Sequence, residues 1–232
     1  MLNFRAIAGG SRLLVDRVLD EDCALCVASS DALVCHACRG NLPRARFACT
    51  RCALPLPRAG TCGACRSRAP AFDGAIAAFD YRFPVDRLVR RFKYAGDLAL
   101  GRWLAERLAA SIDGEPMPSL IVAPPSTRQR LRERGFNPAL EVAKRVAAHV
   151  AVPCSLEGLI RTRETVPQPG LGRDERRRNL EGVLATRLHL EGKSVALVDD
   201  VMTTGATADA AARVLKRAGA ERVCVWVVAR AP

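Results

Sequence analysis

Apolar and polar residues follow different patterns before and after about residue 70. From Gly74 onward, short apolar runs alternate with segments in which apolar residues recur every three to four positions. Such runs predict buried strands, and the 3.6-residue spacing predicts amphipathic helices. We expect strands at 74–81, 120–123, 183–189, 195–198 and 222–229, and helices that begin near 84, 100, 138 and 207. This alternation predicts an α/β fold: a mainly parallel sheet with helices on both faces.

The first 70 residues have a different character. Residues 1–20 fit a short helix, whereas residues 23–70 show almost no aliphatic periodicity and hold four CxxC pairs. A segment with so few apolar residues cannot form a core by itself, so we expect bound metal to organise it. The sequence therefore predicts an N-terminal helix and metal-binding module at residues 1–70, followed by an α/β domain at 71–232.

The cysteine pairs have the spacing of metal ligands. Two thiolates on one turn can reach a single ion at about 2.3 Å, and four pairs complete two tetrahedral sites. Two structural zinc ions suit this basic, hydrophilic segment better than iron–sulfur clusters. Sequential pairing fits a double zinc ribbon, and an interleaved arrangement stays open. His36 is expected at the surface. The expected ligands are Cys23, Cys26, Cys35, Cys38, Cys49, Cys52, Cys62 and Cys65.

The charge of the chain favours anionic partners. Its formal net charge is +12, and Arg39 to Pro70 contains seven arginines and no acidic residue. Arginine pairs two phosphate oxygens at once, so a partner that carries phosphate groups is expected, although a coding bias towards arginine explains part of the charge. The sequence shows no membrane span and no signal-peptide core, and we expect a cytoplasmic protein.

A loop near the C-terminus carries the strongest signal for small-molecule chemistry. An apolar strand ends in Asp199 and Asp200, and a turn rich in Thr and Gly then opens a helix. Backbone N–H groups and hydroxyls at 203–207 can hold a phosphate, and Gly205 allows its close approach. The paired carboxylates can accept hydrogen bonds from ribose hydroxyls or hold Mg²⁺ through water. An ordinary strand–helix turn is the alternative interpretation.

A second candidate segment lies upstream, at 123–139. It follows a buried strand at the sheet edge where open α/β folds bind ligands, and its arginines could face a diphosphate. The other interpretation is that they form the solvated start of a helix. The polar segment at 161–180 predicts a long loop that could close over the site, and an exposed charged linker is the alternative interpretation.

Strand, acid pair and TTGAT loop together resemble the type I phosphoribosyltransferases. With the paired CxxC module, FKYAGD at 92–97 and RERGFNPA at 132–139, the chain resembles the ComF family over nearly its whole length. That family joins a double zinc ribbon to a phosphoribosyltransferase-like domain. Two departures are Ala123-Pro124-Pro125-Ser126 in place of a PVPL-like turn, and Val183 where Phe is common.

The resemblance implies a site for phosphoribosyl diphosphate (PRPP) with Mg²⁺, and a role in uptake or handling of single-stranded DNA together with other uptake proteins. Asp199, Asp200 and Arg176 become the candidate catalytic residues. The PRPP-binding candidates are Asp199, Asp200, Val201, Met202, Thr203, Thr204, Gly205, Ala206, Thr207, Pro124, Pro125, Arg134 and Lys93.

Three functional classes fit these features. The chain could be a nucleic-acid-binding protein that keeps the ribose-phosphate pocket, a catalytic phosphoribosyltransferase, or an adaptor that acts through the ribbon. We favour the first, because the sequence ends directly after its last strand, without an obvious segment for stacking on a base, and because the ribbon is free of acids. The acceptor base, the choice between DNA and RNA, and the oligomeric state stay open.

Overall fold

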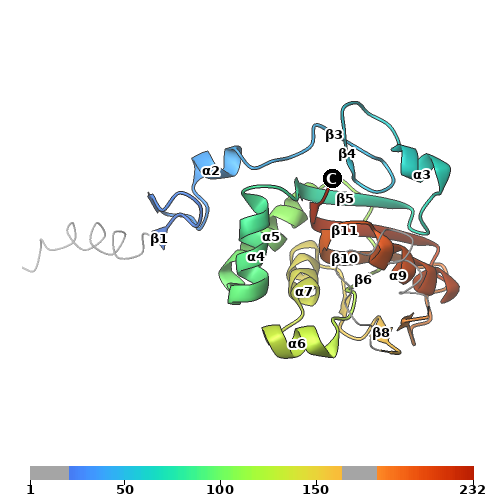
Figure 1. The fold of residues 1–232 in the computed structure, drawn as a ribbon. Helices are drawn as coiled ribbons and strands as arrows, with labels where there is room; N and C mark the ends of the chain where they lie inside the picture. The colour runs from blue at the N-terminus through green and yellow to red at the C-terminus, as the bar shows by residue number, and fades with distance from the viewer. Residues whose placement is uncertain (1–20, 164–181) are drawn as a thin grey trace, which may run out of the picture. The chain divides into compact units, whose positions relative to one another are not determined.

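The computed structural model describes residues 21–163 and 182–232 (Figure 1). The chain divides into two compact units after Leu42, whereas the sequence pattern predicts a domain boundary after Pro70. The helix expected at 1–20 and most of the loop expected at 161–180 lie outside the described residues. No helix within the described ranges is long and apolar enough to cross a membrane.

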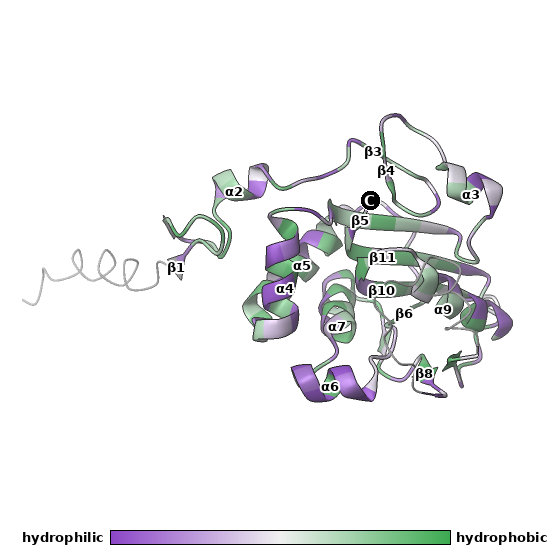
Figure 2. Cartoon of the chain, in the orientation of Figure 1, coloured by the Kyte–Doolittle hydropathy of each residue, from purple (hydrophilic) through white to green (hydrophobic). Residues whose placement is uncertain are grey.

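The larger unit is built on a five-stranded parallel sheet. Its order is β5-β11-β10-β6-β7, and each neighbouring pair is parallel. The central strands are apolar on both faces, as Figure 2 shows for β10 and β11, because helices cover both sides. The strands are β5 (Gly74–Asp80), β6 (Leu120–Val122), β7 (Cys154–Ser155), β10 (Ser194–Met202) and β11 (Arg222–Arg230).

Helices pack on the two faces of this sheet. On one face α5 packs against β5 and β11, and α7 against β6 and β10, whereas α9 covers β10 and β11 from the other face (Figure 1). On the α9 face, Val195 and Leu197 share a core with Ala211 and Leu215. The helices are α4 (Val85–Ala95), α5 (Leu98–Ser111), α6 (Arg128–Arg134), α7 (Pro138–Val150) and α9 (Ala206–Arg217).

The FKYAGD stretch is the corner between α4 and α5. Gly96 ends α4 in the left-handed conformation, with φ of 67°, which glycine adopts without steric cost. Asp97 then caps α5 by accepting a hydrogen bond from the Leu100 N–H at 3.0 Å. A side chain at Gly101 would clash with the Phe92 ring, so these residues set how closely the two helices pack.

The first unit is small. It holds the two-stranded pair β1 (Glu21–Asp22) and β2 (Ser29–Ser30), which is antiparallel, and the short helix α2 (His36–Gly40). Val34 is buried here, and His36 is exposed.

The second cysteine segment belongs to the larger unit. It contains the antiparallel pair β3 (Phe47–Ala48) and β4 (Pro55–Leu56), and α3 (Gly63–Ser67). Cys49, Cys52 and Cys62 are buried in the same core cluster as α9, together with Phe72. Metal is therefore not the only factor that organises this segment, because it also contributes to the core of the α/β unit.

Most expected elements are present with shifted ends. The strand expected at 183–189 is reduced to β9 (Leu184–Ala185), which pairs antiparallel with β8 (Ile160–Arg161) and lies outside the main sheet. The strand expected at 195–198 is longer, because β10 continues through both aspartates to Met202. The short strand β7 and the helix α6 were not expected as separate elements.

Candidate functional site

The candidate residues gather at one edge of the sheet. Because all five strands are parallel, their carboxyl ends lie together, where open α/β sheets bind ligands. The end of β10 brings Asp199 and Asp200 to this edge, and the chain that leaves β6 brings Pro124 and Pro125.

Asp199 and Asp200 point in different directions, because successive residues of a strand face opposite sides of the sheet. Asp200 is buried and forms an ion pair with Lys93 of α4, at 2.8 Å between Nζ and Oδ1. Its Oδ1 also accepts a hydrogen bond from the Val201 N–H at 2.6 Å. Asp199 is half-buried and lies in a cavity wall with residues of the following turn.

The pKa of Asp199 lies well above the usual value of an aspartate. Burial, together with the negative charge of Asp200, raises the pKa of Asp199 to about 8, although Lys93 acts in the opposite direction. Near neutral pH Asp199 is therefore largely a neutral acid, which can become a carboxylate when a partner donates hydrogen bonds or carries positive charge. A carboxyl group with such a perturbed pKa is common at functional sites.

The turn after β10 forms a small anion-sized cradle. Gly205 has a φ of 77° and directly precedes α9, and Thr204 Oγ1 accepts a hydrogen bond from the Ala206 N–H at 3.3 Å. The N–H groups at the start of a twelve-residue helix carry partial positive charge. A cavity of about 40 Å³ opens here. Its lining includes Asp199, Val201, Met202, Thr203, Thr204, Gly205, Ala206 and Thr207.

The two upstream sequence signatures pack against each other. The centroids of the Phe92 and Phe136 rings lie 5.4 Å apart. Arg134 of α6 donates a hydrogen bond to the hydroxyl of Tyr94 at 3.1 Å. The Arg134 guanidinium also lies over the Tyr94 ring, 4.7 Å from its centroid. Since Tyr94 follows Lys93, these contacts link Arg134 to the helix that reaches Asp200.

The turn after β6 is fixed by Asn137, which sequence pattern alone assigned to the cap of α7. Its side chain makes no capping hydrogen bond and instead donates to the Pro124 carbonyl at 3.0 Å. Among the described residues, the cis peptide bond is at Phe83–Pro84, and the bonds before Pro124 and Pro125 are trans. The remaining candidate, Arg176, lies outside the described residues.

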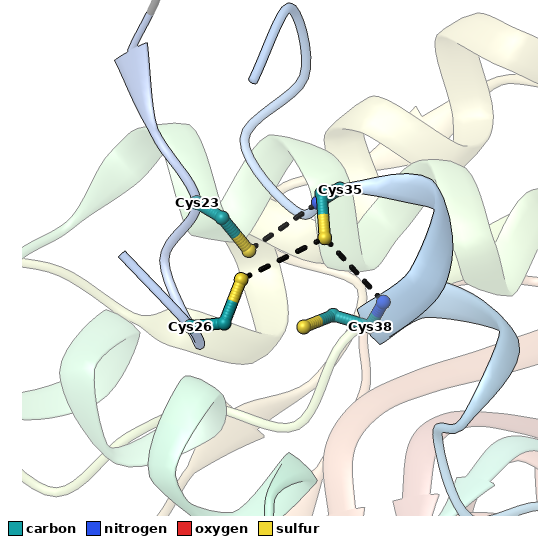
Figure 3. Close-up of side chains that lie close together, drawn as sticks. All are labelled: Cys23, Cys26, Cys35 and Cys38. Carbon is teal, nitrogen blue, oxygen red and sulfur yellow. Dashed lines mark hydrogen bonds between the residues drawn. The ribbon is translucent and has the colours of Figure 1, made fainter. Parts of the chain in front are cut away.

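The first metal cluster has four thiolates that converge (Figure 3). The sulfur atoms of Cys23, Cys26, Cys35 and Cys38 all lie within 4.8 Å of one another, and those of Cys26 and Cys35 are 3.8 Å apart. Four thiolates at about 2.3 Å from one tetrahedral ion are separated by about 3.8 Å. The donor set therefore fits zinc.

The second cluster repeats this arrangement within the larger unit. Cys49, Cys52, Cys62 and Cys65 also lie within 4.8 Å of one another, and the sulfur atoms of Cys52 and Cys62 are 3.7 Å apart. Although burial raises the pKa of Cys49, hydrogen bonds from the backbone N–H groups of Cys62 and Cys52 lower it to about 6, whereas burial raises the pKa of Cys52 and of Cys65. The clusters pair the cysteines sequentially, which decides between the two arrangements that the sequence left open.

Two family models divide the chain in the same order as these features. The model of the double zinc ribbon domain matches residues 14–66. The model of the phosphoribosyl transferase domain matches residues 133–232, which include α6, the acid pair and the turn before α9. The chain therefore combines a double zinc ribbon with a phosphoribosyl transferase domain.

Relatives share both parts. The DNA utilization protein YhgH of Salmonella typhi is 29% identical, over 90% of this chain and 95% of its own length. Competence protein F of Haemophilus influenzae is 29% identical over 85% and 96%, and competence protein ComFC of Bacillus subtilis is 26% identical over 89% and 89%. Because competence protein F and ComFC match most of this chain, the resemblance to the ComF family that was read from the sequence is confirmed.

Among solved structures, the glutamine PRPP amidotransferase of Bacillus subtilis matches 55% of this chain and 26% of its own, at 24% identity and a TM-score of 0.39.

Some contacts at this site were not foreseen from the sequence. Arg230, the last residue of the apolar strand β11, donates hydrogen bonds to the carbonyls of Cys52 and Met202. Only its charge at the end of that strand could have marked it. Tyr94 and Asn137 lie within the recognised signatures, but their partners, Arg134 and the Pro124 carbonyl, depend on tertiary packing. A sequence pattern indicates which residues are present, and it does not indicate which of them meet.

Proposed function

We propose that the chain binds PRPP with Mg²⁺ at the carboxyl edge of its sheet and single-stranded nucleic acid through its basic ribbon, in the cytoplasmic uptake or use of DNA. One observation carries this proposal: an acid pair, anchored by Lys93 at 2.8 Å from Asp200, directly precedes a turn at the start of α9. The names of the relatives, which refer to competence and DNA utilization, support the role with DNA.

The residues at this edge have separate tasks in the proposal. Thr203, Thr204 and the first N–H groups of α9 hold the 5′-phosphate, while the two aspartates accept hydrogen bonds from the ribose hydroxyls. Lys93 and Arg134 supply positive charge towards the diphosphate. Carboxylate oxygens are the ligands that Mg²⁺ prefers, and the ion would neutralise part of the charge of the diphosphate.

The ribbon supplies the nucleic-acid surface. Each of Arg44, Arg46, Arg51, Arg58, Arg66 and Arg68 is exposed. The Arg46 guanidinium lies 5.3 Å from the centroid of the Phe47 ring, and this half-buried ring is the one aromatic group of the ribbon that could stack on a base. Binding through phosphates with little stacking predicts strong salt dependence and weak sequence preference.

A catalytic phosphoribosyltransferase is the second candidate function. In this function, the site would promote displacement of pyrophosphate from PRPP. It would do so by positioning the reactants and neutralising charge, without a covalent nucleophile. Incubation with PRPP, Mg²⁺ and each common base, with pyrophosphate release as the readout, separates the two functions. Turnover above the rate of the Asp200→Asn variant would make the chain an enzyme.

Calorimetric titration of the zinc-loaded protein with PRPP and Mg²⁺ tests the central proposal. Saturable binding with one site per chain is expected. No heat at millimolar PRPP, alongside salt-sensitive binding of an oligonucleotide, would reject the PRPP site and leave the nucleic-acid function.

PRPP affinity should rise with pH. The pKa of Asp199 lies near 8, and a neutral acid must lose its proton before both its oxygens can accept hydrogen bonds. Below that pKa, affinity is expected to fall by up to about tenfold per pH unit, and above it affinity should level off. Titrations between pH 6.5 and 9 measure this. The Asp199→Asn variant, which binds more weakly, should show a flat profile, and an equally steep profile would contradict the assignment.

Arg58→Ala with Arg66→Ala should weaken oligonucleotide binding and reduce its salt dependence. Each phosphate contact on a single strand contributes about 0.7 to the slope of log K against log salt, so the slope should fall by about 1.4. Fluorescence anisotropy with a labelled oligonucleotide at several salt concentrations measures it. Arg102→Ala with Arg187→Ala removes the same charge from exposed positions outside the ribbon and should leave the slope nearly unchanged.

A further inference from the structure

Arg230 is a buried guanidinium that joins the second metal cluster to the candidate phosphate turn. It is the last residue of β11, its side chain is nearly inaccessible at 2% exposure, and no ion pair joins it to a carboxylate in the described part of the chain. We propose that Arg230 is the counter-charge of the second zinc centre and, through its hydrogen bonds, links occupancy of that centre to anion binding at 203–207.

The hydrogen bonds of Arg230 reach both sites. Its Nε donates to the carbonyl of Cys52, one of the four clustered cysteines, at 2.9 Å. Its Nη1 donates to the Met202 carbonyl at 3.2 Å and to the Ala231 carbonyl. Met202 immediately precedes the threonines of the turn, and its carbonyl also accepts the Ala231 N–H at 3.0 Å. One side chain therefore holds a metal-ligand residue and the end of β10 together.

Charge explains why an arginine is buried at this position. Four thiolates around one Zn²⁺ carry a net charge of roughly −2, whereas a buried guanidinium without a compensating anion is strongly unfavourable. Because Arg230 lies against the backbone of Cys52, its positive charge offsets the negative charge of the zinc centre, and the zinc centre offsets the charge of Arg230. Outer contacts of this kind orient metal ligands and tune their affinity for the ion.

The two sites also share a wall. A cavity of about 80 Å³ separates them, and its lining includes Cys52, Cys62, Cys65, Thr204, Gly205 and Ala206. A second tie runs from α9 to the end of the ribbon, where Asp209 accepts a hydrogen bond from the Ala71 N–H at 2.7 Å. The turn cannot move far without moving the backbone around the second cluster.

Thermodynamic linkage turns this geometry into a measurable effect. If zinc in the second centre favours the anion-binding arrangement of the turn, PRPP must favour retention of zinc by the same factor, and couplings of this kind span roughly 5- to 150-fold. This inference rests on the proposed PRPP site. It adds that PRPP changes the retention of zinc by the second centre, whereas zinc in the first unit is unaffected by PRPP.

Zinc release from the full chain tests the linkage. The Cys23→Ser, Cys26→Ser variant keeps only the second centre and can be mixed with a chromogenic chelator, with and without PRPP and Mg²⁺. Saturating PRPP is expected to slow zinc release about tenfold. The same release from a chain that also carries Asp200→Asn and Thr204→Ala should be unaffected, which controls for chelation by PRPP itself. An unchanged rate at a PRPP concentration that saturates the calorimetric titration would overturn the linkage.

Variants at Arg230 test its role directly. Arg230→Met should release zinc from the second centre at least tenfold faster and weaken PRPP binding, whereas Arg230→Lys should restore zinc retention more than PRPP affinity, because it keeps the charge but loses the forked contacts. Arg222→Met, at the exposed start of the same strand, is the matched control. Tryptophan fluorescence checks that each variant is folded.

The two proposals can fail separately. Absence of PRPP binding to the parent chain would reject the PRPP site, yet faster zinc release from Arg230→Met would still support the counter-charge role. Parental zinc retention and parental PRPP affinity in Arg230→Met would overturn the inference while leaving the PRPP site intact.

Discussion

The Asp200→Asn, Thr204→Ala double variant is expected to bind PRPP on the order of 100-fold more weakly than the parent chain. The first substitution removes a carboxylate that is paired with Lys93 at 2.8 Å and proposed to accept a ribose hydroxyl. The second removes a hydroxyl from the phosphate turn. Hydrogen bonds to charged groups contribute about 1.5 to 3 kcal/mol each, and losing two of them at the lower end of this range, about 3 kcal/mol, gives about this factor. Calorimetric titration with PRPP and Mg²⁺ measures the change.

The control for this variant is Asp113→Asn, which removes an exposed acid just beyond α5. Its affinity should match that of the parent chain. If the double variant also bound PRPP with the affinity of the parent chain, the assignment of the site would be wrong, because the ribose and phosphate contacts would then lie elsewhere.

Cys49→Ser with Cys52→Ser should destabilise the whole larger unit. Both cysteines are buried in the core that contains α9, and the second metal centre cannot form without them. Structural zinc sites contribute several kcal/mol to folding, so we expect a decrease in Tm of more than about 10 °C. Thermal unfolding followed by tryptophan fluorescence measures it, because Trp103 and Trp226 both lie in this unit.

Cys23→Ser with Cys26→Ser is the matched comparison. It removes the first centre, which lies in the other compact unit, and should lower the zinc content from two ions to one while leaving the tryptophan transition almost unchanged. Equal decreases in Tm for both pairs would contradict the separation of the two centres.

The sequence predicted the elements whose patterns are local. The apolar strand that ends in two acids, the turn at 203–205 and the helix after it were recognisable from residue order alone, and so were the four CxxC pairs. In each case the residues that determine the structure are neighbours along the chain. The strand expected at 183–189 was wrong for most of its length, because alternating apolar residues there pack against α9 without joining the sheet.

The sequence could not predict contacts that depend on tertiary structure. The ribbon looked too polar to have a core, yet Cys52 and Cys62 are buried because Phe72 and α9 lie beside them. The separate titration of Asp199 depends on how deeply the end of β10 is buried. Arg230 could not be recognised as a link, because its partners Cys52 and Met202 lie 178 and 28 residues away in the chain.

The ion pair between Lys93 and Asp200 also bears on the order in which ligands arrive. The ammonium group of Lys93, which belongs to α4, lies beside Asp200, where the proposed Mg²⁺ would also find a carboxylate ligand. A free Mg²⁺ ion must compete with this built-in cation and shed water to do so. A diphosphate changes this competition for Asp200, because Lys93 can then form an ion pair with the diphosphate instead. At the proposed PRPP site, this exchange would favour a metal ion that enters together with its diphosphate over the metal ion alone.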